Sequence, residues 1–329
     1  MNLFSIDLSF GSAVRLGIAG RDDQSTTKTI PADQLFSWLS LGWIRLFGED
    51  DYNKTFLGPL QNSPSKFVVS DGFPLVDGET LLRIPPWYMV TRSSFDDDPS
   101  IAHKELRTKW ISIGSLHQAL SSDKELASVL LSEPVDTELL SWVRTKRKGE
   151  KDNVPFYTGV VKPRFRQQPT SDEQGTLCYR HFVKIEDIDV SDRLESILEF
   201  MQDDGFGGNR SSGLGRIKSA ALRTTGQNLK SLSQKGANSR FVLLSSCIPT
   251  ERMLENVSKS AEGTNNYSIG KKSGWIYDSA GKATDVRKPS VSYFETGSLF
   301  SIRPDGKVQD VSHGGHRCFK YGVPFVLEG

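Results

Sequence analysis

Glycine and arginine gather in one short stretch of the chain, GFGGNRSSGLGR, at residues 205–216. Five glycines stand within eleven positions, with two arginines and two serines around them, and no acidic residue lies between 205 and 240. The N–H groups of a glycine-rich backbone can form a concave anion-binding surface, and guanidinium groups beside it add charge. The stretch therefore predicts an anion site, and a phosphate backbone is the anion that fits best.

Two common nucleotide-binding motifs do not fit this stretch. GNRSSGLG has the two glycines of a P-loop but lacks the Lys and Ser or Thr that must follow. Arg210 stands where the dinucleotide fingerprint requires its last glycine. The stretch also follows an expected helix instead of opening one. We therefore expect no nucleotide cofactor, and no other cofactor is indicated.

Positive charge is concentrated, although the net charge of the 329-residue chain is only +1. Residues 205–240 hold seven Lys or Arg and no acid, and residues 144–166 hold eight against two acids. A single run of charge is usually just a solvated face. Two basic tracts with Phe156, Tyr157 and Phe165 interleaved favour a localised anion site instead.

The sequence contains only weak indications of a catalytic site or a metal site. The H-x-x-H of SHGGHR (312–317) has no further ligands at a useful spacing, and the acidic run at 96–98 is expected to be a solvated loop. Metal-independent RNA cleavage needs an acid or base near the 2′-hydroxyl, often a histidine. The first helix and the loop before it contain none of the five histidines, which are His103, His117, His181, His313 and His316. We predict no catalytic residue and no metal site.

The loop must be positioned by elements that hydrophobic periodicity reveals. Residues 2–10 alternate like a strand, and a helix is expected from Pro31, with Leu35, Leu39, Trp43 and Leu46 on one face. A second helix is expected over 190–202, with Ser191 as its cap and an apolar face from Val190 to Met201. Further strands are expected at 66–75, 79–86, 175–185 and 214–224.

This order predicts an α+β fold. Strand, helix, two strands, helix and strand make the βαββαβ, ferredoxin-like (RRM-like) arrangement, and the glycine-rich loop then joins its second helix to its fourth strand. Residues 87–174 are expected to be a large insertion, with a helical stretch over 121–151. We assign residues 1–228 to a first domain and 235–329 to a second, smaller ferredoxin-like domain.

The composition is that of an ordinary globular protein, with 36% hydrophobic and 25% charged residues. Three cysteines without a C-x-x-C pair predict a reducing, cytoplasmic environment. The most apolar stretch, residues 35–48, is too short to span a bilayer and contains Arg45, and the N-terminus lacks the pattern of a signal peptide. We therefore expect no membrane partner.

GFGGNRSSGLGRI resembles the glycine-rich loop of the RAMP superfamily of CRISPR-associated proteins. Four more stretches are similar to one branch of that superfamily, the type III-A (Csm) subunit that binds the 5′ tag of the crRNA. They are ADQLFSWLSLGWIRLFG (32–48), FVVSDGFPLVDGETLLRIPPW (67–87), LRTKWISIGSLHQAL (106–120), and a C-terminal pair, SVSYFETGSLFSIRPDGKVQDV (290–311) with HRCFKYGVPFVL (316–327).

The resemblance implies a non-catalytic RNA-binding subunit of a type III-A effector complex that acts in defence against viruses and plasmids. It implies three partners: the crRNA 5′ tag, the large polymerase/HD-type subunit, and a crRNA-backbone RAMP subunit. Arg164 lies in VVKPRFRQQPT (160–170), where the chain departs from the family pattern after Arg166. The implied RNA-binding residues are Gly205, Gly207, Gly208, Asn209, Arg210, Ser211, Ser212, Gly213, Leu214, Gly215, Arg216 and Arg164.

Two alternatives stay open from the sequence. One is a metal-independent endoribonuclease of the RAMP class that processes repeat RNA. The other is a scaffold without RNA contacts, against which the basic glycine-rich loop argues. The aromatic residues that would stack on RNA bases are not identified; Phe165, Tyr179 and Phe206 are candidates that fit a hydrophobic core equally well.

Overall fold

A computed structural model describes most of the chain. The described residues are 2–17, 24–85, 109–122, 131, 133–143, 155–163, 176–224, 240–261, 264–277 and 283–329. They form helices packed on antiparallel sheets, so the predicted α+β class is confirmed. The predicted acidic loop at 96–98, the linker between the two domains, and Arg164 lie outside the described residues.

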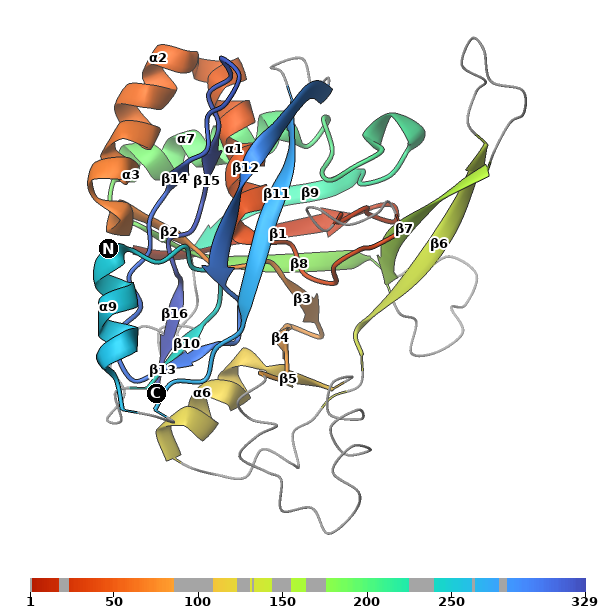
Figure 1. Cartoon of the computed structure of the whole chain (residues 1–329). Helices are drawn as coiled ribbons and strands as arrows, with labels where there is room; N and C mark the ends of the chain where they lie inside the picture. Colours follow the sequence, from red (N-terminus) through yellow and green to blue (C-terminus); the bar gives the residue numbers. More distant parts are fainter. Residues whose placement is uncertain are drawn as a thin grey trace.

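A seven-stranded sheet forms the centre of the N-terminal part (Figure 1). Its order is β5-β4-β3-β8-β1-β9, and β2 pairs with β8 next to β3. The strands are β1 (Asn2–Phe10), β2 (Phe67–Val69), β3 (Phe73–Val76), β4 (Glu79–Arg83), β5 (Trp110–Ser112), β8 (Leu177–Ile185) and β9 (Ile217–Thr224). Strand β1 lies between β8 and β9, and its alternating apolar residues Ile6 and Leu8 are fully buried. The first strand of the sequence is therefore an interior strand, next to the edge strand β9.

Two helices, α1 (Ala32–Phe47) and α7 (Ile188–Met201), pack against each other beside this sheet (Figure 1). Gly42 of α1 lets them come close, because a Cβ there would lie 2.7 Å from side-chain carbons of both Ile197 and Met201. The predicted apolar face of α7 is confirmed as buried. Leu46, predicted on the buried face of α1, is instead 39% exposed at the last turn of the helix.

The N-terminal cap of α7 differs from the prediction. The carboxylate of Asp187 accepts a hydrogen bond from the Asp189 N–H at 3.0 Å and caps the helix. The hydroxyl of Ser191 lies one turn inside, where it donates to the Ile188 carbonyl at 2.7 Å. After α1 the chain continues through α2 (Glu49–Asp51), a wide helical turn (Tyr52–Leu57), α3 (Gly58–Asn62) and a short 3₁₀ turn (Pro64–Lys66).

The strand predicted at 66–75 is split into β2 and β3 by Ser70–Gly72. The amide of Asp71 donates to the Leu244 carbonyl at 2.8 Å, and the amide of Gly72 donates to the Ile30 carbonyl at 2.7 Å. Gly72 crosses directly over the imidazole of His181, where a Cβ would lie 2.4 Å from Nε2. The strand thus breaks because its backbone bonds go to other segments.

The predicted helix within the insertion is wrong. Residues 135–143 form β6 (Val135–Val143), which pairs along its whole length with β7 (Pro155–Pro163) in a hairpin that projects from the body of the molecule (Figure 1). Leu and Glu in this stretch favour a helix locally, but a ladder of nine paired positions overrides that preference. The helix of this region, α6 (Ile113–Ser122), starts and ends earlier.

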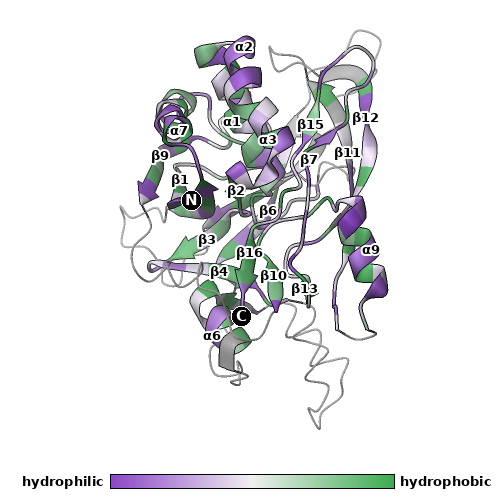
Figure 2. Cartoon of the chain, turned by 90° about the vertical axis from the view of Figure 1, so that its left-hand side faces the viewer, coloured by the Kyte–Doolittle hydropathy of each residue, from purple (hydrophilic) through white to green (hydrophobic). Residues whose placement is uncertain are grey.

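The C-terminal part contains a three-stranded sheet and two hairpins. The sheet has the order β13-β10-β16, made of Leu299–Phe300, Phe241–Leu243 and Val326–Glu328. The hairpins are β11 (Ile269–Tyr277) with β12 (Ala283–Phe294), and β14 (Gln309–Asp310) with β15 (Phe319–Lys320). Helix α9 (Glu251–Lys259), capped by the Thr250 hydroxyl, is largely hydrophilic and lies on the outside (Figure 2).

The two parts share one apolar core. Val242, Tyr321 and Phe325 of the C-terminal part belong to the same buried cluster as the residues beneath α1. The Tyr321 hydroxyl donates to the Phe67 carbonyl at 3.1 Å and accepts from the Val69 amide at 3.0 Å. The edge of β2 is therefore anchored by a residue more than 250 positions away.

A buried group of charges also joins the two parts, and we call it the Asp33 cluster (Asp33, Asp71, Ser246, Lys272, Thr296 and Lys320). The Asp33 carboxylate, in the first turn of α1, receives the ammonium groups of Lys272 at 2.9 Å and Lys320 at 3.1 Å. Burial raises the pKa of Asp33, but the two ammonium groups outweigh it and hold the pKa well below its usual range. Asp71 accepts from the Ala32 amide at 2.8 Å, and burial raises the pKa of Asp71 to about 6.

Candidate nucleic-acid interface

The glycine-rich loop connects α7 to β9, as predicted, and the chain itself holds it in place. The Phe206 amide donates to the Gly215 carbonyl at 2.9 Å and closes the base of the loop. The Gly208 amide donates to the Arg15 carbonyl at 3.1 Å, and the Gly215 amide donates to the Ala13 carbonyl at 2.8 Å. The segment that follows β1 thus serves as a backbone template for the loop.

The glycines of the loop fall into two groups. Gly205, Gly207 and Gly215 have positive φ, and a Cβ at any of them would lie within 2.8 Å of a backbone oxygen of the same chain. The tightest is Gly215, where a Cβ would lie 1.8 Å from the Phe206 carbonyl oxygen. Gly213 also has positive φ, but nothing lies within 4 Å of its Cβ position. These three glycines thus allow close approach of the protein's own backbone, whereas Gly213 faces open space.

Asn209 and Leu214 serve the shape of the loop. Asn209 adopts a left-handed conformation with φ 55°, which a short polar side chain tolerates better than most. Its side-chain oxygen accepts from the Arg15 guanidinium at 3.1 Å, and its amide nitrogen contacts the Thr158 hydroxyl of β7 at 3.4 Å. Leu214 is only 7% exposed, so its side chain anchors the loop and does not face solvent.

The two loop arginines differ in what they contact. Arg210 folds back on its own chain, where its guanidinium donates to the Asp204 carbonyl at 3.2 Å and lies 3.8 Å from the Asp204 carboxylate. That carboxylate also pairs with Arg45 of α1. Arg216 is exposed, and its side chain has no partner among the described residues. Ser211, Ser212 and Gly213 are exposed beside it.

A neighbour that the sequence did not single out completes this surface. Arg15 pairs with Gly208 across an isolated bridge and also bonds Asn209, so it lies directly against the loop. The preceding residue, Val14, pairs with Val161 of β7, which places the β6–β7 hairpin next to the same segment. No motif marks Arg15; its only signal is an arginine in the short segment that follows the buried strand β1, which ends at Phe10. The candidate interface therefore joins the loop, the segment after β1, and the base of the hairpin.

The candidate stacking aromatics are core residues where they are described. Phe206 is buried edge-on against Trp38, and the Trp38 indole donates to the Gly205 carbonyl at 2.9 Å. Tyr179 is fully buried on β8 and donates its hydroxyl to the Lys28 carbonyl. Phe165 lies outside the described residues. These contacts explain the shape of the loop, and they leave Phe206 and Tyr179 no exposed ring to offer a base.

The described histidines lie apart from this surface. His181 is buried on β8, where Nδ1 contacts the Ser70 carbonyl at 2.9 Å, and burial lowers the pKa of His181 to about 4. Burial also lowers the pKa of His117 in α6. His313 and His316 pair across a turn between β14 and β15. Within the described part of the chain, no group of three or more metal-ligating side chains comes together, and no helix is long and apolar enough to cross a membrane.

Comparisons with known proteins agree on one family. The model of the CRISPR Csm4 C-terminal domain matches residues 236–328. The chain is 28% identical over 307 residues to the Csm4 protein of Streptococcus thermophilus, covering 92% of each chain. It is 25% identical over 305 residues to the Csm4 protein of Mycobacterium tuberculosis H37Rv, covering 92% of this chain and 91% of that one.

Solved structures share the fold. A chain in the crystal structure of the Csm3-Csm4 subcomplex of the type III-A CRISPR-Cas interference complex matches with a TM-score of 0.64 at 14% identity, over 99% of each chain. A chain in the Csm1-Csm4 cassette in complex with cA4 matches with a TM-score of 0.61 at 12% identity, over 99% of this chain and 97% of that one. The resemblance predicted from the glycine-rich loop is thus confirmed: over about nine tenths of its length the chain is similar to Csm4 subunits of type III-A (Csm) CRISPR systems.

Proposed function

We propose that this chain is the non-catalytic subunit of a type III-A effector complex that holds the repeat-derived 5′ tag of the crRNA. The observation that carries the proposal is the exposed end of the glycine-rich loop. Ser211, Ser212 and Gly213 face solvent there, next to the exposed guanidinium of Arg216. Hydroxyl groups and an exposed guanidinium on a glycine-rich turn are suited to phosphate oxygens.

The anchoring of the loop supports this assignment. Backbone bonds to Ala13 and Arg15 fix the loop before any ligand arrives. A ligand then loses less affinity to the ordering of the protein, since the loop is already in place. Phosphate contacts of this kind position RNA without reading its sequence, so recognition of the tag needs contacts to bases elsewhere.

We also propose that the chain has two ferredoxin-like domains and two partner subunits. The order β9-β1-β8-β2, with α1 and α7 as the two connecting helices, supports a ferredoxin-like first domain carrying an insertion. We assign a second ferredoxin-like domain to the C-terminal part. The Csm3-Csm4 and Csm1-Csm4 structures support docking of this chain onto a crRNA-backbone subunit and onto the large polymerase/HD-type subunit. The three cysteines without a C-x-x-C pair support a place in the cytoplasm.

The absence of catalysis is part of the proposal. Of the described histidines, His181 is buried in the sheet and kept neutral by burial, and the others lie outside the loop. The runner-up, a repeat-processing endoribonuclease, has no specific observation in its favour. We therefore expect tag RNA to be recovered intact after incubation with the chain.

The test compares two arginines of the same loop. Full-length chain and its Arg216→Ala and Arg210→Ala variants are titrated with a labelled RNA of the repeat-derived 5′ tag at two or more salt concentrations. Loss of the exposed guanidinium in Arg216→Ala should weaken binding and lower the slope of log K against log salt by about 0.7 for each lost phosphate contact. Arg210→Ala should change the slope less, because Arg210 already contacts Asp204.

Melting temperature and RNA integrity are recorded for every variant. Arg216→Ala should melt like the parent chain, since its side chain has no protein partner among the described residues. Equal RNA affinity and equal salt slope for Arg216→Ala and the parent would refute the loop as a phosphate site. Cleavage of the RNA would instead support the alternative hypothesis, a repeat-processing endoribonuclease.

A further inference from the structure

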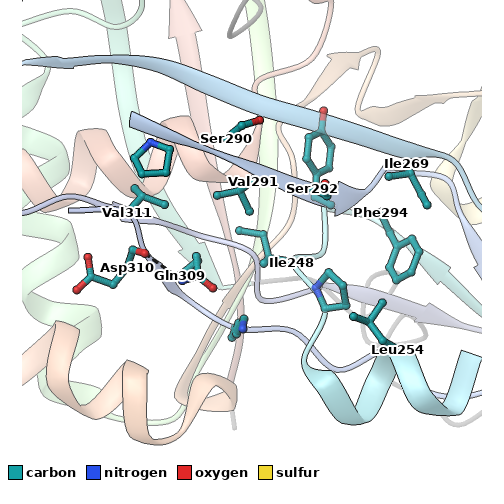
Figure 3. A pocket seen from close by; sticks show the side chains of 14 residues that line it. Ile248, Leu254, Ile269, Ser290, Val291, Ser292, Phe294, Gln309, Asp310 and Val311 are labelled. Carbon is teal, nitrogen blue, oxygen red and sulfur yellow. Dashed lines mark hydrogen bonds between the residues drawn. The ribbon is translucent and has the colours of Figure 1, made fainter. Parts of the chain in front are cut away.

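A groove in the C-terminal part is not used by the proposed RNA site. It has a volume of about 420 Å³ and lies along β12, between that strand, the end of the Cys247–Pro249 segment, and residues 307–311 (Figure 3). Its walls are largely apolar and include Ile248, Leu254, Ile269, Val291 and Val311. Leu254 is 50% exposed and Ile269 is 63% exposed, so the rim presents large apolar side chains to solvent.

The edge of β12 that lines this groove has unused hydrogen-bonding groups. Phe294 exchanges two backbone hydrogen bonds with Cys247 on this edge, at 2.8 and 2.9 Å. Because backbone groups alternate along a strand, the N–H and C=O of Ser292 point to the same side, away from β11. No hydrogen bond to them is found among the described residues. The strand segment that pairs at Cys247 turns aside to pair Pro249 with Gly306, which leaves the Ser292 position open.

One charge in the groove lacks a counterion. Lys307 lines the groove half-buried, and its ammonium has no partner among the described residues. The acidic residue of the groove, Asp310, is bound locally by Ser312, whose side chain and then its amide, at 2.8 Å, hydrogen-bond the carboxylate and lower the pKa of Asp310. Among the described residues the Lys307 ammonium therefore has no ion-pair partner between the apolar walls, and a carboxylate on the occupant would complement it.

We propose that this groove binds an extended segment of a partner protein, which pairs with the Ser292 edge of β12, inserts apolar side chains between Ile269 and Val311, and places a carboxylate on Lys307. Strand addition supplies the backbone partners that the edge lacks, and the apolar walls accept alternate side chains. A nucleic-acid strand fits less well, since the walls offer one cation and no exposed stack of aromatic rings. This site is distinct from the glycine-rich loop and does not depend on the RNA proposal.

The test uses the full chain and a defined probe. The probe is a fluorescein-labelled peptide, acetyl-Thr-Val-Thr-Val-Glu-Val-Thr-amide, and its twin with Lys in place of Glu. We expect the Glu peptide to bind and the Lys twin to bind roughly tenfold more weakly, as the loss of a charge-assisted hydrogen bond in an apolar site predicts. Amide hydrogen exchange at 290–294 should slow when the Glu peptide is present.

Matched variants locate the peptide. Lys307→Met should remove the preference for the Glu peptide, whereas Lys271→Met, an exposed lysine of β11 outside the groove lining, should keep it. Ser292→Pro removes an outward N–H that β11 does not use, so it should weaken both peptides. If Ser292→Pro fails to fold, the Lys307→Met result decides.

Three outcomes would overturn the proposal. They are equal affinity for the Glu and Lys peptides, unchanged exchange at 290–294 with bound peptide, or the absence of binding by the Glu peptide. Protection of 290–294 by an oligouridine RNA, run as a parallel arm, would reassign the groove to nucleic acid. Since neither peptide contacts the loop, the Arg216→Ala variant should bind the Glu peptide like the parent, which separates this test from that of the RNA site.

Discussion

The glycine-rich loop and the Asp33 cluster use the same kinds of charged residue for opposite purposes. In the loop, Arg216 is exposed with no protein partner among the described residues, while its backbone surroundings are fixed. In the cluster, Lys272 and Lys320 are only 14% and 13% exposed and both pair with Asp33, so their charges are neutralised within the fold. The difference shows that a cation's neighbours, and not its presence in a basic tract, decide whether it is available to a ligand.

The largest expected effect comes from breaking the cluster. Asp33→Ala leaves two largely enclosed ammonium groups without their carboxylate, so the free energy of unfolding should fall by about 3–5 kcal/mol. Urea denaturation followed by circular dichroism measures it. The surface pair Lys259–Glu255 provides the control, because Glu255→Ala removes an exposed pair and should cost less than about 1 kcal/mol. Similar losses for the two variants would mean that the cluster does not hold the two parts together.

Two glycine substitutions test the loop, again through the free energy of unfolding. In Gly215→Ala the new Cβ meets the Phe206 carbonyl and φ is positive, so the chain should lose about 3 kcal/mol. In Gly213→Ala φ is also positive but the space is open, so the loss should be about 1 kcal/mol. Both variants keep every charge of the loop. Equal losses in urea denaturation would show that Gly215 does not pack against its own backbone as described.

A pH dependence of stability, expected to be smaller than the effects of Asp33→Ala and Gly215→Ala, tests the second acid of the cluster. The pKa of Asp71 is raised to about 6 in the fold, so the folded chain binds a proton that the unfolded chain releases near pH 4. The contribution of Asp71 to stability should therefore decline as pH rises from about 4 to 6, by roughly 2 kcal/mol, and stay level above. Asp71→Asn should abolish this decline.

The contribution of Asp33 to stability changes with pH in the opposite direction and over a different pH range. Its pKa is lowered in the fold, so its contribution is present above pH 4 and is lost as the solution becomes more acidic. Denaturation curves of the parent and the Asp71→Asn variant between pH 4 and 7 isolate the Asp71 part. Curves of the two proteins that stay parallel over this range would contradict the raised pKa.

The sequence predicted elements whose periodicity is long and regular. Strand β1, helix α1, strand β8 and the buried face of α7 are confirmed because each buries one set of evenly spaced apolar residues. Strand β6 was missed because its pairing with β7 depends on residues about twenty positions away, which local propensity does not contain.

The candidate site was predictable in position but not in detail. The run of glycines and arginines located the loop, because few other structures need five glycines in eleven positions. The different contacts of Arg210 and Arg216 depend on where Asp204 lies in space, and the role of Arg15 depends on a bridge to Gly208 across most of the first domain. No local sequence pattern predicts either of these two arrangements.

The early place of β1 in the sequence has a consequence for synthesis of the protein. Its partners are β8 and β9, so residues 2–10 have no sheet neighbour until β8 (Leu177–Ile185) has been made. At about 5–20 residues per second, this strand waits roughly 9–35 s with its apolar residues exposed. The template on which the glycine-rich loop settles is thus made first and used last, and nascent chains that stop short of β8 should depend on chaperones.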